Sequence, residues 1–291
     1  MKQSVFNLFF PYDEKVDSTI IYNTRTNALA LLDKMHYEVL RRFIENNEKI
    51  KDEDFIQSLY STGYLVDDEI NELALLRYNM YKDRFSTHHI GLTIAPTMNC
   101  NFRCPYCYEK SSLQNKRMNS EVQNKVVSFV EGWAKFIHNL SIDWYGGEPL
   151  LEMDLIKNMS KQFIAICQEK GVQYNSSMVT NGYHLTPQIA KELKELKVEN
   201  IQITIDGPED IHNVRRILAN GQGTFKRIIR NICDSIDYLQ TLTIRINTDF
   251  ENQDRIDEVF AILKENNLSD KVRVYLGFVQ STDDYSSEKC M

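Results

Sequence analysis

Three cysteines lie within eight residues in the segment TMNCNFRCPYCYEK, which runs from Thr97 to Lys110. They are Cys100, Cys104 and Cys107, and the segment follows an apolar, strand-like run. Thiols gathered in one loop oxidise readily unless something binds them. Because thiolates bind zinc and iron–sulfur clusters and also form redox pairs, this segment predicts metal or redox chemistry.

Four interpretations of the segment differ in what the thiols hold. CPYC alone, Cys104 to Cys107, would be a thioredoxin-like dithiol pair that leaves Cys100 unused. A structural zinc site would need a fourth ligand, such as His88 or His89. Three unrelated buried cysteines are the third interpretation. The fourth is a 4Fe–4S cluster, in which three thiolates leave one iron open to an outside molecule.

Polar and glycine-rich turns follow further strand-like runs along the chain. GGEP spans Gly146 to Pro149, TNG spans Thr180 to Gly182, and DGPED begins at Asp206. In parallel β/α folds, ligands bind at the carboxyl ends of the strands, so we expect these turns to share one site with the cysteines. Arg245 and Asn247 alternate along a later strand, which predicts that both point into the fold, with an ordinary salt bridge as the alternative.

The elements that must position these residues alternate regularly between residues 88 and 280. Six strand-like runs are separated by five helical segments, which predicts a parallel sheet with right-handed crossovers. A closed eightfold barrel would need two more units. We therefore expect an α/β fold, a partial (β/α)6 TIM-like barrel. Ser120, Gly171 and Pro187 are the expected N-cap, C-terminal stop and first-turn residue of successive helices.

Residues 1–85 have a different rhythm and predict a small α+β binding module. VFNLFF and STIIYNT are strand-like, and ALALLDKMHYEVLRRFIENN has apolar residues at helical spacing. A short helix, a turn at Gly63 and the strand YLV follow in DEDFIQSLYSTGYLVDD. A polar helix, EINELALLRYNMYKDRF, completes this part of the chain.

Composition narrows the class of protein. The chain has 291 residues, of which 42% are apolar, and a formal net charge of −7, so a nucleic-acid partner is not indicated. The N-terminus lacks the cleavage site of a signal peptide, and no apolar run reaches the roughly 18 residues of a membrane helix. Six cysteines are too few for a secreted disulfide scaffold of this length. We expect a cytoplasmic protein without membrane contact.

CxxxCxxC with an aromatic residue before the last cysteine resembles the signature of radical S-adenosylmethionine enzymes. CNFRCPYCYEK is similar to the branch that modifies peptides and proteins, such as anaerobic sulfatase maturases and peptide-crosslinking maturases. The resemblance covers residues 88–280 and implies the same partial barrel. It also implies a 4Fe–4S cluster held by Cys100, Cys104 and Cys107, with S-adenosylmethionine chelated to the open iron.

The same resemblance assigns most of the cofactor contacts. GGEP matches the family motif for the methionyl amino group, which implicates Gly146, Gly147 and Glu148. The backbone of Tyr106 is expected at the adenine edge, and Asn181 of TNG near the ribose.

TIDGPEDIHNVRR resembles the family segment S-x-D-G-P-x-x-x-H-D-x-x-R. Thr204 takes the Ser position, toward the ribose or carboxylate, while Asp206 and His212 match directly. Arg216 falls at the family Arg and is expected to pair with the methionyl carboxylate. Asn213 stands where the family usually has Asp, which removes a charge.

The implied reaction is reductive cleavage of S-adenosylmethionine to methionine and a 5′-deoxyadenosyl radical, which abstracts a substrate hydrogen. We expect a ribosomally made peptide as substrate and a thioether or carbon–carbon crosslink as product, with an electron donor such as flavodoxin or ferredoxin. Formylglycine generation, as in sulfatase maturases, is an alternative. A non-catalytic homologue that only binds a leader peptide is another. No residue is indicated as catalytic.

Both ends of the chain carry further implications of the resemblance. Residues 1–85 are similar to the winged-helix-like domain that adds a precursor's leader segment to a sheet edge as a strand. Residues 281–291 would be the start of a cysteine-rich auxiliary-cluster domain, called SPASM or twitch, most of which is missing. Cys290 stands where its first cysteine is expected.

Overall fold

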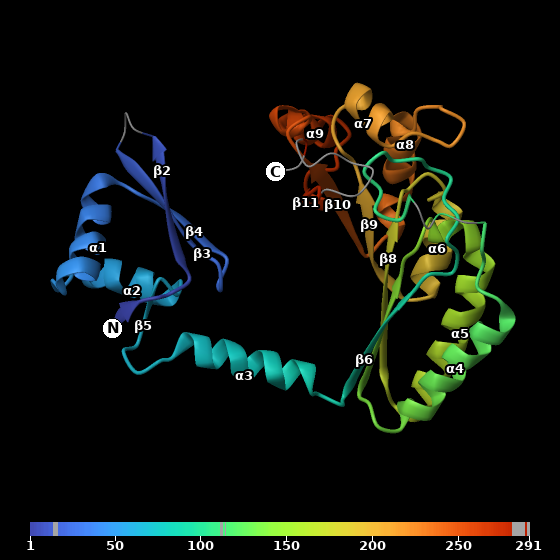
Figure 1. Ribbon diagram of the computed structural model, residues 1–291, viewed down its shortest axis with the longest axis horizontal. Coiled ribbons are helices and arrows are strands. Elements are labelled where there is room, and N and C mark those ends of the chain that lie inside the picture. The colour runs from blue at the N-terminus through green and yellow to red at the C-terminus, as the bar shows by residue number, and fades with distance from the viewer. Residues whose placement is uncertain (14–16, 111–112, 114, 281–288, 290–291) are drawn as a thin grey trace. The chain divides into compact units, whose positions relative to one another are not determined.

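The computed structural model describes residues 1–13, 17–110, 113, 115–280 and 289. Two compact units divide the chain, Met1–Ser86 and Thr87–Met291, here called the N-terminal unit and the barrel unit (Figure 1). Cys290 and residues 281–288 lie outside the described residues, so the expected auxiliary-cluster ligand stays a prediction. None of the described helices has the length and apolar character that crossing a membrane requires.

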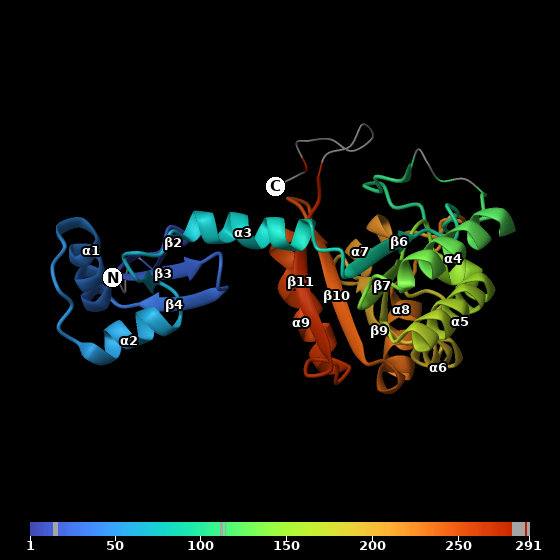
Figure 2. The ribbon, with the colours of Figure 1, turned by 90° about the horizontal axis from the view of Figure 1, so that it is seen from below.

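Six parallel strands form the sheet of the barrel unit, which confirms the predicted partial barrel. They pair in chain order, so β6 and β11 are the two edges and the sheet stays open (Figure 2). The strands are β6 (His89–Ile94), β7 (Asn139–Trp144), β8 (Gln173–Thr180), β9 (Val198–Thr204), β10 (Thr241–Thr248) and β11 (Val272–Phe278). The helices are α4 (Ser120–Ala134), α5 (Met153–Lys170), α6 (Pro187–Glu195), α7 (Glu209–Arg215), α8 (Phe225–Ser235) and α9 (Ile256–Glu265).

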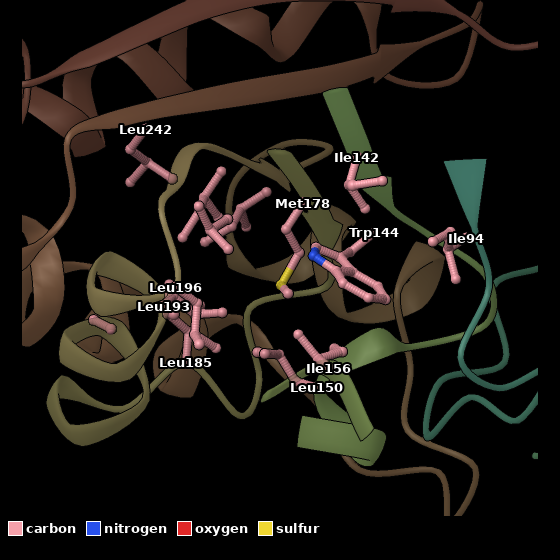
Figure 3. Close-up of a cluster of buried hydrophobic side chains, with 14 of the residues drawn as sticks. Ile94, Ile142, Trp144, Leu150, Ile156, Met178, Leu185, Leu193, Leu196 and Leu242 are labelled. Atoms are coloured by element: carbon pink, nitrogen blue, oxygen red, sulfur yellow. The ribbon is translucent and has the colours of Figure 1, made fainter. Parts of the chain in front are cut away.

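Along each strand of the sheet, successive side chains alternate between a face that the helices cover and an inner face. In β10, Leu242, Ile244 and Ile246 are buried, whereas the residues between them are only half-buried. Figure 3 shows the buried layer, in which Trp144 and Met178 lie near Ile156 and Leu150. Each fully buried large apolar side chain contributes about 1.5–3 kcal/mol, so this layer is the main source of stability of the unit.

Helix ends follow local signals, with one correction to the sequence-based assignment. Ser120 is the first residue of α4, and its N-cap is Asn119, whose side chain accepts a hydrogen bond from Val122 N at 2.9 Å. Asn119 has the extended backbone that an N-cap needs, whereas Ser120 is already helical. Gly171 and Pro187 take the predicted places, as the C-cap of α5 with φ +69° and in the first turn of α6.

Within its described residues, 1–13 and 17–86, the N-terminal unit combines two small antiparallel sheets with three helices. The larger sheet has the order β2–β3–β4, and β1 pairs with β5. The hydrophobic core of the unit includes Ile21, Leu40 and Leu59. The elements are β1 (Lys2–Gln3), β2 (Asn7–Asp13), β3 (Ser18–Asn23), β4 (Ala28–Leu32), α1 (Lys34–Asn46), α2 (Glu53–Ser61), β5 (Leu65–Val66) and α3 (Glu72–Arg84).

The prediction that residues 28–32 begin a helix was wrong, because they form β4. Asn23 Oδ1 accepts hydrogen bonds from Arg25 N and Thr26 N at 3.0 Å, and Asn27 has φ +60°, which closes a hairpin onto β3. The helix starts only at Lys34, after Asp33 has capped it. Hairpin pairing therefore outweighs the apolar helical spacing of this segment.

Candidate functional site

Loops at the carboxyl ends of adjacent strands enclose one cavity of about 530 Å³. They follow β6, β7, β8 and β9, and residues of β10 and β11 complete the wall. Two of the predicted site residues, Glu148 and Asp206, are fully buried and do not line the cavity. The others all line it: Cys100, Cys104, Tyr106, Cys107, Gly146, Gly147, Asn181, Thr204 and Arg216.

The three cysteines of the β6 loop are free and half-buried. Backbone hydrogen bonds from Cys107 N to Cys104 O (3.2 Å) and from Lys110 N to Cys107 O (3.1 Å) fold the segment into consecutive turns. Burial raises the pKa of the Cys100 thiol to about 11 and that of Cys104 to about 12. Since the thiolate is the form that binds metal, ligation would displace these protons.

The placement of the thiols fits a cluster better than a single ion. Among the residues that the structure describes, no three histidine, cysteine, aspartate or glutamate side chains converge as one metal ion requires. In a 4Fe–4S cluster each thiolate binds a different iron, so the ligands stay farther apart. His88 stacks on His138 and His89 begins β6, at the opposite end of that strand from the cysteines. Neither is placed to be the fourth ligand of a zinc site.

Gly146 and Gly147 let the β7 loop lie directly on the cysteine loop. A Cβ at Gly147 would be 2.3 Å from the carbonyl oxygen of Asn99, and one at Gly146 would be 2.6 Å from that of Thr97. Hydrogen bonds from Gly147 N to Thr97 O (3.1 Å) and from Glu148 N to Asn99 O (2.9 Å) join the loops. The glycines are therefore required by the contact between the two loops, whatever they also offer to a ligand.

Glu148 ties the β7 loop to the TNG turn after β8. Its carboxylate accepts hydrogen bonds from Leu150 N (3.0 Å), from the Thr180 hydroxyl (2.6 Å) and from Asn181 N (2.7 Å). Burial raises the pKa of the carboxyl group, although these hydrogen bonds oppose that shift. The side chain is fully buried, so it positions the two loops and does not offer a charge to the cavity.

The Tyr106 side chain joins the cysteine loop to the ends of β9 and β10. Its hydroxyl donates to the Asp206 carboxylate and accepts from Arg216 Nη1 (3.1 Å) and Asn247 Nδ2 (3.2 Å). Burial, and after it the charge of Asp206, raises the pKa of the phenol, so the group stays protonated and keeps donating. Asp206 does not reach the cavity itself and instead holds the Tyr106 side chain in place.

The two consecutive arginines at the end of α7, Arg215 in its last turn and Arg216 as its C-cap, have different surroundings. Arg215 Nη1 donates to both carboxylate oxygens of Asp249, at 3.0 and 2.8 Å, and anchors α7 to the end of β10. Arg216 lies over the Phe102 ring, 5.6 Å from its centroid, and its buried Nε has no hydrogen-bond partner among the described residues. A bound carboxylate would satisfy such a donor. Sequence reasoning missed Arg215, for which Asp249 directly after a strand was the available signal.

His212 and Asn213 have structural partners. His212 Nδ1 accepts from Asp206 N (3.4 Å), and Nε2 lies 3.1 Å from Thr224 Oγ1. Because the Thr224 hydroxyl donates to Arg216 O (2.6 Å), the network assigns the ring proton to Nε2. Burial, followed by the nearby arginine charges, lowers the pKa of His212 well below 6.5. Asn213 Oδ1 accepts from Thr224 N (2.8 Å) and from the next backbone N–H (3.0 Å), and so caps α8 without a charge.

Several residues of the cavity wall were not identified as site residues from the sequence. Some lie on the strands, where the two-residue alternation of inward and outward positions could have found them, and the others lie on the loops after β6 and β7, next to the recognised motifs. The predicted inward orientation of Arg245 and Asn247 is confirmed, because both line the cavity. The unrecognised wall residues include Tyr108, Glu109, Tyr145, Gln202 and Phe278.

These groups suit the cofactors that the sequence resemblance implies. Three thiols on one loop match the donor set of a 4Fe–4S cluster with one open iron. The unpaired Arg216 Nε suits the carboxylate of a methionyl group. The cavity that both line has room for a ligand larger than a single amino acid.

Comparison with known proteins supports the same assignment. The radical SAM cyclopropyl synthase TigE of Paramaledivibacter caminithermalis is 24% identical over 241 residues, which are 74% of this chain and 48% of that protein. The cysteine-type anaerobic sulfatase-maturating enzyme of Clostridium novyi is 26% identical over 183 residues, 60% of this chain and 48% of that protein. The chain thus spans about half the length of these relatives.

A solved structure shares the fold. Native anSMEcpe with bound AdoMet and Kp18Cys peptide superposes with a TM-score of 0.56 at 24% identity, over 65% of this chain and 51% of that chain. The model of the radical SAM superfamily matches residues 94–285, which are more than half of the sequence and include every predicted cofactor residue. The chain therefore belongs to the radical SAM superfamily.

Proposed function

We propose that the chain is a radical S-adenosylmethionine enzyme that modifies a ribosomally made peptide, forming a thioether or a carbon–carbon crosslink. Proteins of this superfamily use a 4Fe–4S cluster and S-adenosylmethionine. The supporting observation is that three free thiols, the Gly146–Gly147 loop and Arg216 line one cavity at the carboxyl ends of six parallel strands.

Some residues around the cavity would contact the cofactor, and others hold the loops that carry those residues. When bound, the cluster and S-adenosylmethionine together supply the radical that abstracts a substrate hydrogen. Arg216 would hold the methionyl carboxylate, and the Gly146–Gly147 backbone would receive the amino group. Thr204 and Asn181 would contact the ribose. Tyr106 and Glu148 hold the loops that carry these groups, so the geometry is set before a ligand arrives.

The choice of a peptide substrate has two supports. The structure of anSMEcpe, which shares the fold, has both AdoMet and the Kp18Cys peptide bound. In the N-terminal unit, β4 pairs with β3 along one edge, and no described residue pairs with its other edge. That strand exposes Leu29 and Leu31, with 68% and 57% of their surfaces accessible. We assign this edge to strand addition by a leader segment.

The decisive experiment is anaerobic reconstitution with iron and sulfide, followed by S-adenosylmethionine, dithionite and an assay for 5′-deoxyadenosine. We expect about four iron atoms per chain and formation of 5′-deoxyadenosine. Cys104→Ala should lose both, whereas Cys233→Ala, outside the cavity, should retain both. A protein that binds zinc and no iron would overturn the proposal, and close to eight irons would contradict a single cluster.

Formylglycine formation is a second candidate, favoured by the likeness to the Clostridium novyi sulfatase-maturating enzyme. A sulfatase-derived cysteine peptide converted to an aldehyde would select it, and a crosslinked precursor peptide would select the first proposal. S-adenosylmethionine that stays intact with either peptide would indicate a binding homologue. We also propose a flavodoxin or ferredoxin as electron donor and a cytoplasmic location, where clustered thiols stay reduced.

A further inference from the structure

Arg245 is a cation of the cavity wall that none of the proposed cofactor contacts uses. It lies on the inner face of β10 and is half-buried. Its Nε donates to Asn247 Oδ1 at 2.7 Å. Its two Nη nitrogens form no hydrogen bond to the described residues, and no carboxylate among them pairs with it. The salt bridge considered from the sequence is therefore not found in the described part of the chain.

Residues on three strands hold the guanidinium in place. Its Cζ lies 5.8 Å from the centroid of the Tyr275 ring, and the Tyr275 hydroxyl donates to Gln202 Oε1 at 2.7 Å. Gly277 leaves the space that the group occupies, because a Cβ there would be 2.5 Å from Arg245 Nε. An ordered arginine loses little conformational freedom when it binds a ligand, so this arrangement favours binding through the free Nη pair.

Arg245 and Arg216 are separate cationic positions of the same cavity. Arg216 contacts Phe102 and Tyr106, both on the cysteine loop, which places it beside the expected cluster. Arg245 instead contacts Asn247, Tyr275 and Gly277, which lie on β10 and β11. No described residue of the cysteine loop contacts it directly, although Asn247 also donates to the Tyr106 hydroxyl. Cofactor and substrate must both enter this cavity, so the cation away from the cysteine loop is available to the substrate.

We propose that Arg245 forms a subsite for a carboxylate of the peptide substrate, which binds the two Nη groups as a fork. This inference rests on the proposed function, since it names what that site recognises. A planar carboxylate matches the guanidinium geometry, and charge-assisted hydrogen bonds of this kind are the strong ones in proteins. The carboxylate belongs either to an acidic side chain or to the C-terminus of the peptide.

The test measures peptide binding without turnover, by anaerobic isothermal titration of the reconstituted full chain in the presence of S-adenosylmethionine. The probes are acetyl-Gly-Asp-Gly-amide, acetyl-Gly-Asn-Gly with a free C-terminus, and the neutral acetyl-Gly-Asn-Gly-amide. We expect at least one carboxylate peptide to bind about tenfold more tightly than the neutral one. Comparing the first two distinguishes a side-chain carboxylate from a terminal one.

Two variants assign the preference to Arg245. Arg245→Gln should abolish the difference between the peptides, and Arg245→Lys should retain part of it, since it keeps the charge without the fork. Arg273→Gln should retain all of it, because Arg273 lies two residues from Tyr275 on the same strand face, outside the cavity. All three variants should bind S-adenosylmethionine within about twofold of the wild type.

Three results would overturn the inference. One is equal affinity of the wild type for all three peptides, including no detectable binding of any. Another is an equal loss of preference in Arg273→Gln. The third is a tenfold loss of S-adenosylmethionine affinity in Arg245→Gln, which would assign Arg245 to the cofactor carboxylate. A chain that discriminates between the peptides and yet forms no 5′-deoxyadenosine would refute the proposed function and retain the subsite.

Discussion

Replacing Glu148 by Gln tests whether a buried carboxylate joins the β7 and β8 loops. Its two oxygens accept three hydrogen bonds, and all three donors come from the backbone or from the Thr180 hydroxyl. Leu150 N donates to Oε1 and Asn181 N donates to Oε2, so each carboxylate oxygen faces a backbone N–H that can only donate. An amide in place of the carboxylate therefore turns an N–H group toward a donor, whichever way it is oriented.

This contact between two donors sets the loss in unfolding free energy that we expect for Glu148→Gln. If the amide nitrogen takes the place of Oε2, it faces Asn181 N at 2.7 Å, and a charge-assisted hydrogen bond becomes a contact between two donors. Losing such a bond and leaving a buried donor unpaired costs about 2–4 kcal/mol. The amide is easier to bury than the carboxylate, whose pKa burial raises, so we expect the lower half of that range.

Urea unfolding of the barrel unit, followed by tryptophan fluorescence, measures this loss. The chain has two tryptophans, Trp133 and Trp144, and both lie in the barrel unit, so the signal reports that unit. Glu169→Gln is the matched control, because Glu169 is exposed and pairs only with Lys170 among the described residues. It should leave the midpoint unchanged. A Glu148→Gln protein within 1 kcal/mol of wild type would refute the assigned role.

Three other substitutions have defined outcomes. Gly147→Ala should reduce iron bound after reconstitution several-fold, since its Cβ would be 2.3 Å from a backbone oxygen, whereas Gly132→Ala, with nothing within 4 Å, should bind iron normally. Asn119→Ala should lower the urea-unfolding free energy by about 1 kcal/mol, and an equal loss in Ser120→Ala would contradict the assigned cap. The pKa of His212 is lower in the folded chain than in the unfolded chain, where it is near 6.5. The stability that comes from the neutral, buried ring is therefore complete above pH 6.5 and is lost as the pH falls below that value. Unfolding between pH 7.5 and 5.5 should therefore show a slope up to about 1.4 kcal/mol per unit steeper in wild type than in His212→Gln, and equal slopes would refute this.

The sequence predicted the barrel well because its signals are local. Each strand is a short apolar run, and each site loop follows directly from one, so strand ends and loop positions could be assigned together. The cysteine motif is also local, because all three cysteines lie within eight residues. Gly171 and Pro187 took their predicted places because a helix end depends on a few neighbouring residues.

What the sequence missed depends on distant partners. The Tyr106 hydroxyl meets Asp206 and Arg216, which are 100 and 110 residues away, and no local pattern encodes that meeting. Residues 28–32 have helical spacing but form a strand, because they pair with β3 in a hairpin. Asn119 and Ser120 are both good caps, and only the entry angle of the chain decides between them.

The two faces of the sheet also separate two kinds of evolutionary constraint. Positions such as Leu242 and Ile244 pack against helices, so a change there disturbs the packing of the whole unit. Gln202, Thr243 and Arg245 occupy the opposite face and are only half-buried. Substitutions on that face are expected to change which substrate is accepted while the hydrophobic layer stays intact. One scaffold can in this way diversify its substrates without having to rebuild its core.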